Sequence, residues 1–492
     1  MVWTTFIADG LTPVAALARV GPHPLGRFLL ESAEQQERVG RYSFVGVNVR
    51  ELIAFSAGTG YAFRHHVRDG LIYEAERWRS RDPLAELRRR LEALRTVPHP
   101  DLPPFFGGAV GFLGYDVVRT IERLGEVRPD PLDSWMAAFL VTDMVVAFDH
   151  FRRTAYLAAL APREPGESPE RTYDRACARL EEGWSRLVER PRDALDAEFL
   201  EAPPPSPAPA VPEDEAFEAA VQRAKRYIAA GDIFQVVLSR QQSLPCLEPP
   251  LRVYRRLRSI NPSPYMFYLE IADPRRSGRP LYLVGASPEV MVRLTGRRAM
   301  LRPIAGSRPR GCCEAEEQEL ARQLAADPKE LAEHMMLVDL GRNDLGRVCR
   351  FGTVRVARLL EVERYSHVMH LVSEVEGELA EGLDAFDLMR AAFPAGTVTG
   401  APKVRAMEII DELETSGRGP YAGAVGYFAA NGDADSCITI RTLAIRAGVA
   451  YARAGAGIVA DSDPRRELAE THHKASALLS ALAASRREAV RV

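Results

Sequence analysis

The chain alternates between stretches with a two-residue hydrophobic period and stretches with a helical period. Strand-like stretches, most of them alternating between apolar and polar residues, occur at 41–47, 137–149, 233–239, 423–429, 436–446 and 449–453. Helical periodicity occurs at 83–94, 170–189 and 214–230. Asn431-Gly432 separates two strand-like stretches and indicates a hairpin, although its loop is longer than two residues. Antiparallel strands with interspersed helices predict an α+β fold.

A proline-rich segment divides the chain. Residues 202–212 read Ala-Pro-Pro-Pro-Ser-Pro-Ala-Pro-Ala-Val-Pro. Because proline lacks an N–H and disfavours helix in the residue before it, this segment can form neither a helix nor a central strand. A chain of 492 residues is also too long for one ordinary core. We therefore expect a first domain at 1–200, a linker at 201–213 and a second domain at 214–485.

Composition narrows the class of protein. The chain is 46% hydrophobic and 27% charged, as in a soluble globular protein, and its net charge of −3 offers no basic surface to nucleic acid. No apolar run reaches the length of a membrane span, so we expect no membrane partner and no export. The six cysteines lack the spacing of a zinc or redox motif, which favours a reducing cytoplasm.

Two segments predict helices that each begin with a pair of acids. Asp327-Pro328 and Asp463-Pro464 have the residues that cap and start a helix. Glutamates three residues apart follow on one face of each helix, namely Glu330, Glu333, Glu467 and Glu470. If the two helices face each other, their carboxylates would repel unless a hard cation lay between them, and an oxygen-only ligand set suits Mg²⁺.

Five further features could belong to a functional site. The loop at 396–403 precedes a helix, so its backbone N–H groups could approach an anion, and Gly455-Ala456-Gly457 is either a close-packed strand or a set of backbone donors. Alternation places Arg441 opposite Ile438 and Ile440, and Lys474 shares a helix face with Glu470. His370 lies in a strand-like segment, as a packed side chain or an acid–base group.

Several segments resemble the chorismate-utilising enzymes, and most closely the large subunits of anthranilate synthases. The matching segments are Gly231–Arg240, Pro303-Ile304-Ala305-Gly306-Ser307, Val338–Asp344, Gly396–Lys403 and Gly455–Val459, together with the two acidic helices. The likeness covers nearly all of residues 214–485. It implies a large antiparallel β-sheet sandwich with flanking helices, a catalytic second domain that binds chorismate, and a first domain with a regulatory tryptophan site.

The resemblance also implies roles for individual residues. Glu333 and Glu470 would bind Mg²⁺ on the ring carboxylate of chorismate, supported by Glu330 and Glu467. Arg441 and Lys474 would hold the two substrate carboxylates, since arginine suits bidentate carboxylate recognition. The other implied substrate contacts are Tyr421, Gly400, Gly455, Gly457 and Ala305, and the implied catalytic residues are His370, Thr399 and Gln235.

Two positions separate the chemistries within the family. Members that add water have a lysine where this chain has Gln235, and a neutral amide cannot act as that base, which favours ammonia as the nucleophile. Typical aminodeoxychorismate synthases have a nucleophilic lysine where this chain has Ala305. Both differences favour an anthranilate synthase, a lyase that forms anthranilate and pyruvate.

The first domain resembles the tryptophan feedback site of anthranilate synthases. The matching segments are Leu29-Leu30-Glu31-Ser32, Arg41-Tyr42-Ser43 and Asn261–Phe267. The expected inhibitor contacts are Glu31, Ser32, Arg41, Pro264, Tyr265 and Met266, with Glu31 as the acid for the ammonium group of tryptophan.

The source of ammonia points to a partner. The chain has no cysteine-centred glutaminase signature, and Gly311-Cys312-Cys313-Glu314 is a turn into a charged helix. Ammonia would therefore come from solution or from a glutamine amidotransferase small subunit, in a hetero-oligomer. The alternatives are an aminodeoxychorismate synthase, an isochorismate or salicylate synthase, and a catalytically silent protein that binds tryptophan.

Overall fold

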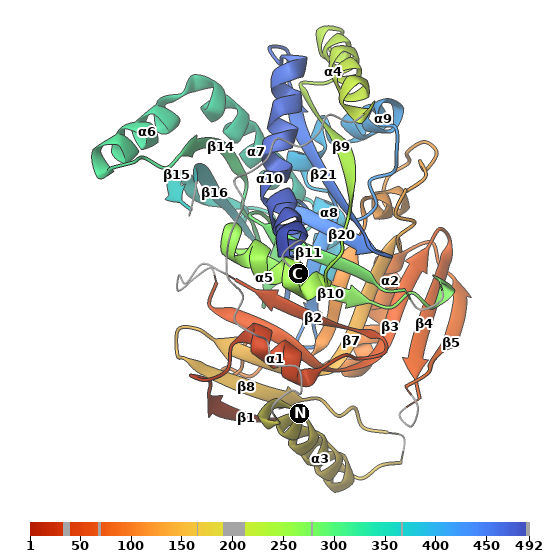
Figure 1. Cartoon of the computed structure of the whole chain (residues 1–492). Coiled ribbons are helices and arrows are strands. Elements are labelled where there is room, and N and C mark those ends of the chain that lie inside the picture. Colours follow the sequence, from red (N-terminus) through yellow and green to blue (C-terminus); the bar gives the residue numbers. More distant parts are fainter. Residues whose placement is uncertain are drawn as a thin grey trace.

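The computed structural model is a mixed arrangement of helices and antiparallel strands (Figure 1). It describes residues 1–32, 40–66, 70–164, 166–189, 212–276, 279–365 and 368–488. The α+β class and the large antiparallel sheet are confirmed. In the described part of the chain, none of the helices has the length and apolar character to span a membrane.

The strands form one hydrogen-bonded network in which the pairings are antiparallel. They are β1 (Val2–Ile7), β2 (Gly26–Glu31), β3 (Tyr42–Ser56), β4 (Thr59–His65), β5 (Ile72–Arg79), β6 (Gly108–Leu113), β7 (Ala137–Asp149), β8 (Thr154–Ala159), β9 (Gln235–Pro245), β10 (Tyr265–Ile271), β11 (Leu281–Ser287), β12 (Val290–Thr295), β13 (Arg298–Leu301), β14 (Ile304–Pro309), β15 (Arg355–Arg364), β16 (Val368–Glu378), β17 (Gly400–Ala401), β18 (Ala424–Ala429), β19 (Ala434–Ile438), β20 (Thr442–Arg446) and β21 (Val449–Ile458).

The helices are placed between and around these strands. They are α1 (Pro13–Val20), α2 (Pro83–Leu91), α3 (Pro169–Val188), α4 (Pro212–Ala229), α5 (Pro250–Ile260), α6 (Glu314–Ala326), α7 (Pro328–Gly346), α8 (Ala385–Ala392), α9 (Lys403–Leu413) and α10 (Pro464–Glu488), with short 3₁₀ turns at Glu92–Leu94, Tyr115–Thr120, Pro274–Arg276 and Gly396–Val398.

Strands from before and after the proline-rich segment pair directly. β2 pairs with β10, so that Glu31 lies opposite Met266, and β6 pairs with β18. α4 begins at Pro212, so the last two residues of the range 201–213 are helical and not linker. Proline is tolerated there because the first helical residue needs no N–H donor. Residues 201–211 lie outside the described residues.

The predicted strand at 436–446 is interrupted, which corrects the sequence analysis. β19 ends at Ile438 and β20 begins at Thr442. Between them Arg441 has a φ of +49°, which is rare for a residue with a side chain and cannot continue a strand. The predicted hairpin around Asn431-Gly432 is confirmed, because β18 and β19 pair antiparallel.

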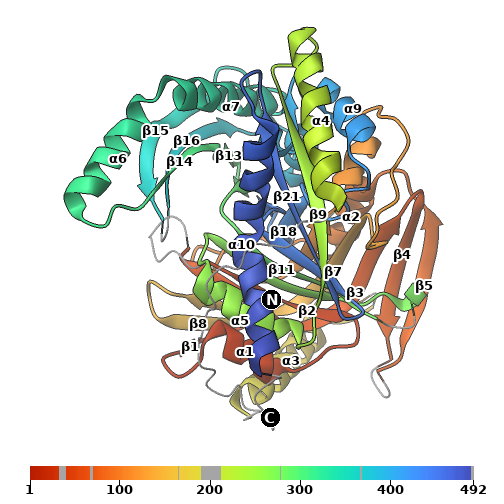
Figure 2. The same cartoon turned by 45° about the horizontal axis from the view of Figure 1, so that its top comes forward.

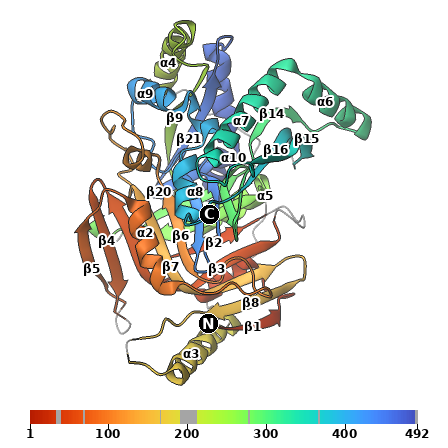
Figure 3. The ribbon, with the colours of Figure 1, turned by 180° about the vertical axis from the view of Figure 1, so that it is seen from behind.

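Long helices stand on the part of the sheet that carries β9 and β21. α10 runs between α4 and α7 (Figures 1 and 2) and packs on β21, α4 and α5. From behind, α2 covers the strands of the N-terminal part (Figure 3), where Leu84 and Leu87 join Phe55 in the core. The fold therefore brings the two predicted acidic helices, α7 and α10, next to each other.

Candidate active site

Both acidic helices begin as predicted. The Asp327 carboxylate accepts hydrogen bonds from the backbone N–H groups of Lys329 and Glu330 at 3.0 and 3.3 Å. Asp463 accepts from Arg466 N at 3.0 Å. These caps satisfy N–H groups that have no partner within the helix, and they fix which side chains lie in the first two turns.

The acids of the two helices share one region, which we call the carboxylate site: Glu330, Glu333, Glu467 and Glu470. Burial raises the pKa of Glu333, and the charges of Glu330 and Glu470 raise it further against a hydrogen bond from Gln235. Burial likewise raises the pKa of Glu467, and the charge of Glu470 adds to it. Glu333 and Glu467 therefore lie within electrostatic reach of acids from both helices, because the charges of Glu330 and Glu470 act on Glu333 and that of Glu470 acts on Glu467.

The carboxylate site fits a hard cation only with additional ligands. Each glutamate offers oxygen donors, as Mg²⁺ prefers. Within the described residues, no three of these acids bring ligand atoms within 4.8 Å of one another. Lys474 also pairs with Glu470 at 2.6 Å. A cation held between the helices would therefore need oxygen atoms from substrate or water to complete its coordination.

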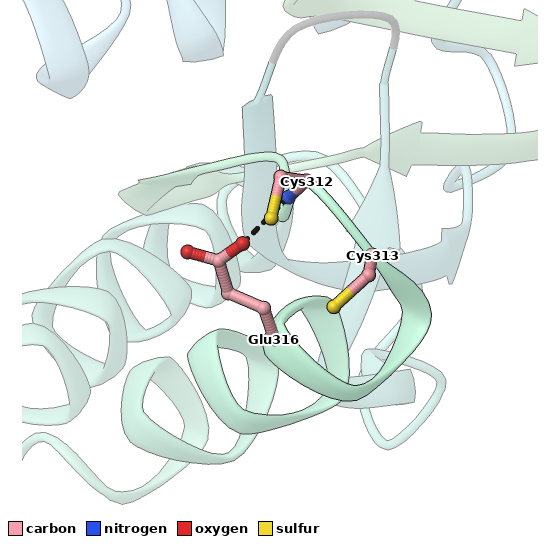
Figure 4. Close-up of side chains that lie close together, drawn as sticks. All are labelled: Cys312, Cys313 and Glu316. Carbon is pink, nitrogen blue, oxygen red and sulfur yellow. Dashed lines mark hydrogen bonds between the residues drawn. The ribbon is translucent and has the colours of Figure 1, made fainter.

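The one compact group of potential metal ligands among the described residues lies elsewhere. Cys312, Cys313 and Glu316 cluster at the exposed start of α6 (Figure 4). The Cys312 backbone N–H donates to the Glu316 carboxylate at 2.6 Å, and Cys313 is the N-cap residue. This segment is a turn into a charged helix, as predicted from the sequence, and Glu316 serves as a cap there.

His370 lies on β16, beside β14, the strand that contains Ala305. Ser307 pairs with His370, and the His370 Nδ1–H donates to the Gly306 carbonyl at 2.8 Å. Burial lowers the pKa of His370, and the charge of Arg441 lowers it further. A neutral imidazole that donates through Nδ1 keeps its Nε2 lone pair for a proton. Glu330 is close by, since a Cβ at Gly306 would lie 2.9 Å from its carboxylate.

Two glycines make room for the implied substrate contacts. A Cβ at Gly455 would lie 2.7 Å from the Tyr421 hydroxyl, and a Cβ at Gly457 would lie 2.6 Å from the Gln235 amide nitrogen. That nitrogen donates to Glu333 at 3.1 Å. Lys474 Nζ donates to the Gly455 carbonyl at 3.0 Å. These residues are therefore contiguous with the carboxylate site.

The loop before α9 packs against Gln235 and so helps to position the residues of the candidate site. Gly400 has a φ of +139°, and a Cβ there would lie 2.2 Å from the Gln235 carbonyl oxygen, so only glycine fits. The Thr399 side chain is fully buried, and its hydroxyl donates to the Ala395 carbonyl at 2.9 Å. Thr399 can therefore only accept a further hydrogen bond.

Arg441 reaches the site by a different route from the one predicted. Its left-handed backbone, and not strand alternation, sets its direction. Burial lowers its pKa, whereas Glu289 and Tyr365 raise it. Its charge also acts on His370. Arg441 thus lies among the ionisable groups that the sequence analysis assigned to the site.

The structure adds Glu289, which the sequence analysis missed. It lies in the turn between β11 and β12 and is 8% exposed. Burial raises its pKa to about 8, opposed by the Thr397 hydroxyl and by the charges of Lys474 and Arg441. A carboxyl group of this kind is protonated at neutral pH and can donate a proton. The available signal was an acid at the start of an apolar strand, Ser287-Pro288-Glu289-Val290-Met291.

The predicted inhibitor residues line one cavity of about 470 Å³, which we call the N-terminal cavity. All six are present: Glu31, Ser32, Arg41, Pro264, Tyr265 and Met266. The Ser32 hydroxyl is buried without a hydrogen-bond partner in the described structure. Glu31 already accepts hydrogen bonds from Tyr254 and Arg258 of α5. Asp433 and Asp435, which the sequence analysis missed, add acids to this cavity.

Comparisons with known proteins identify the family. The family model of the chorismate binding enzymes matches residues 26–480. The chain belongs to this family. Anthranilate synthase component 1 of Thermus thermophilus is 47% identical, with 97% of this chain and 96% of that protein aligned. The corresponding protein of Streptomyces coelicolor is 45% identical over 97% of this chain and 88% of its own.

Solved structures agree with the assignment to the chorismate binding enzymes. Anthranilate synthase component I from Streptococcus pneumoniae superposes with a TM-score of 0.74 at 35% identity, and covers 96% of this chain and 98% of its own. The region matched by the family model contains the glutamates of both acidic helices and also the residues of the N-terminal cavity.

Proposed function

We propose that this chain converts chorismate and ammonia to anthranilate and pyruvate, the first committed reaction of tryptophan synthesis. Relatives that are 47% and 45% identical along nearly the whole chain carry the name anthranilate synthase component 1. The candidate site has the groups that this reaction needs: a neutral acid, a neutral histidine, cations for two carboxylates and a cluster of acids for a metal ion.

The amide side chain of Gln235 determines which nucleophile can react. Its amide lies against Glu333 and Gly457, inside the candidate site. An amide cannot remove a proton from water at neutral pH, whereas ammonia already has a reactive lone pair. Ala305 likewise offers no amine for a covalent intermediate. Addition of ammonia is thus the chemistry that these two residues permit.

The first step is an exchange at the ring. The ammonia nitrogen bonds to ring carbon 2 while the bond from carbon 4 to its hydroxyl breaks. Glu289, protonated through its pKa of about 8, gives its proton to the departing hydroxyl, which leaves as water. The ammonium group formed at carbon 2 then releases a proton, so charge and atoms balance.

The second step forms the aromatic ring. The Nε2 atom of His370 takes the proton from carbon 2, and the bond from carbon 3 to the enolpyruvyl oxygen breaks. The enolpyruvate takes up a proton and leaves as pyruvate. Hydrogen bonding of Nδ1 to Gly306 keeps the ring of His370 in the orientation and tautomer that this transfer needs.

Substrate charge is neutralised by fixed groups. Arg441 and Lys474 face the two carboxylates, and Tyr421 donates a hydrogen bond to the same arm of the substrate. Glu333 and Glu470 would hold Mg²⁺, with Glu330 and Glu467 in support, and bound Mg²⁺ would neutralise the ring carboxylate. Thr399 accepts a hydrogen bond at the floor of the site.

The proposed function includes inhibition by tryptophan and a supply of ammonia from a partner subunit. Tryptophan would bind in the N-terminal cavity, where the Ser32 hydroxyl, which has no partner among the described residues, could accept or donate a hydrogen bond. A glutamine amidotransferase subunit would deliver ammonia within a cytoplasmic hetero-oligomer.

One assay tests the proposal. The purified chain is incubated with chorismate, Mg²⁺ and ammonium, and anthranilate is followed by its fluorescence, first without and then with tryptophan. Anthranilate formation that tryptophan suppresses is the expected result. Isochorismate, salicylate or aminodeoxychorismate as the product would refute the proposed reaction. Tryptophan binding without any product would mean a silent binding protein.

A further inference from the structure

Three buried charged residues form an ion cluster next to the segments that carry the candidate substrate contacts. Glu414, Arg418 and Arg453 have side chains that are at most 5% exposed. Glu414 accepts hydrogen bonds from Arg418 at 2.7 Å and from Arg453 at 2.9 Å. Burial opposes ionisation of Glu414, but the two arginines outweigh it and lower its pKa. The carboxylate is therefore charged and separates two guanidinium groups that would otherwise repel each other.

The cluster joins four separate segments by hydrogen bonds. Arg418 donates to the carbonyls of Val237 and Val398, both at 2.7 Å. Arg453 donates to the Ser239 hydroxyl at 2.9 Å and to the Gly417 carbonyl. These segments lead directly to implied site residues, which are Gln235 on β9, Thr399 in the loop before α9, Tyr421 after the turn, and Gly455 on β21.

Tyr421 depends most directly on this cluster. Its backbone N–H donates to the Arg418 carbonyl at 3.2 Å, and the Arg418 guanidinium lies 5.6 Å from the centre of its ring. Ala422 has a φ of +61°, a strained conformation that the surrounding structure must impose on the turn, by which we mean the segment between α9 and β18. The Tyr421 hydroxyl meets Gly455 on β21, the strand that also carries Arg453.

We propose that Glu414 is a positioning residue that, through Arg418 and Arg453, holds the Tyr421 hydroxyl at Gly455 in the orientation that donates to a substrate carboxylate. This inference rests on the proposed function. Loss of the Glu414 charge leaves two buried arginines without their shared partner, so the turn and β21 move apart and the hydroxyl is displaced. Displacement of a binding group by about 1 Å reduces kcat/KM by on the order of 100-fold.

A double-mutant cycle tests the inference. Glu414→Gln, Tyr421→Phe and the double variant are compared with the unchanged chain by kcat and KM for chorismate. Glu414→Gln alone is expected to lower kcat/KM by about 100-fold, mainly through KM, but by less than about 3-fold in the Tyr421→Phe background. Additive effects of the two substitutions would overturn the inference.

A matched control separates positioning from general instability. Asp273 is also a buried carboxylate between two arginines, Arg275 at 2.9 Å and Arg446 at 3.0 Å, and it lies outside the candidate site. Asp273→Asn is expected to lower the Tm as Glu414→Gln does, with little change in kcat/KM. An equal loss of kcat/KM in both variants would refute a specific role for Glu414.

A second variant and a binding measurement extend the test. If Glu414→Gln does not fold, Ser239→Ala replaces it, because Ser239 accepts from Arg453 and donates to Glu414 at 2.8 Å. The cycle is repeated on chorismate binding measured by calorimetry. Absence of turnover in the unchanged chain would then refute the proposed function, while coupling in the binding data would still support the role of Glu414.

Discussion

Glu289 and His370 are held in their neutral forms by the same physical cause acting on opposite charges. Burial disfavours the ionised form of each, which raises the pKa of the acid to about 8 and lowers that of the histidine. One group can therefore donate a proton at neutral pH while the other accepts one. Neither state can be assigned from the residue type alone, since an exposed glutamate is ionised at this pH.

The pH dependence of kcat/KM follows from these two shifts. Glu289 loses its proton as the pH rises through about 8, so the rate falls above that value. His370 gains a proton only below its ordinary value of 6.5, so the rate also falls in acid. We expect a bell-shaped profile with ammonia concentration, not total ammonium, held constant. Glu289→Gln should lower kcat by on the order of 100-fold or more and remove the alkaline limb.

Arg441 supplies a second prediction at the residue scale. Its side chain has no hydrogen-bond partner among the described residues, as expected of a guanidinium kept for a ligand. Arg441→Lys keeps the charge but loses the planar pair of donors, so KM for chorismate should rise about 10-fold while kcat changes less. Arg405→Lys, on the exposed face of α9, is the control. Equal KM values for all three proteins would contradict substrate binding by Arg441.

At the scale of elements, the two acidic helices were the most accurate part of the sequence analysis. Their starts depend on local chemistry, an aspartate that caps and a proline at the first position, and both are observed. Their mutual approach depends on the packing of α10 on β21, α4 and α5, which no local pattern encodes. The prediction of one continuous strand at 436–446 was wrong because the alternation of apolar and polar residues does not reveal a left-handed backbone at Arg441.

The carboxylate site gives a prediction at this scale. Glu333→Gln and Glu470→Gln should each raise the Mg²⁺ concentration needed for half-maximal activity and lower the maximal rate by at least about 10-fold, because each removes one charged oxygen ligand. Glu319→Gln on the exposed face of α6 should leave the Mg²⁺ dependence unchanged. Full activity of the unchanged chain after metal removal by a chelator would refute the metal requirement.

At the scale of the whole molecule, the N-terminal cavity and the candidate active site are joined by packed helices. Glu31 in the cavity is bonded to Tyr254 and Arg258 of α5, and α5 packs against α10, which carries Glu470 and Lys474. A ligand that competes for the Glu31 carboxylate would therefore act on a helix in contact with α10. This continuity would give the proposed feedback inhibition a structural route.

Ser32→Ala tests regulation with little risk to folding. The Ser32 hydroxyl has no partner in the described structure, so its removal leaves no group newly unpaired. The tryptophan concentration for half inhibition should rise about 10-fold, since one hydrogen bond to the inhibitor is lost. Inhibition is expressed relative to the uninhibited rate of each protein. Unchanged inhibition would place the tryptophan site outside the N-terminal cavity.

The sequence by itself determined several local features: some of the strands and helices, where the acidic helices begin, and the presence of Gln235 and Ala305 at the positions that separate the chemistries. Capping, alternation and side-chain type act over a few residues, so they can be read along the chain. Only the tertiary structure decided the protonation of Glu289, the direction of Arg441 and the joining of distant segments by Glu414. Burial and charge depend on neighbours that are distant in sequence and close in space.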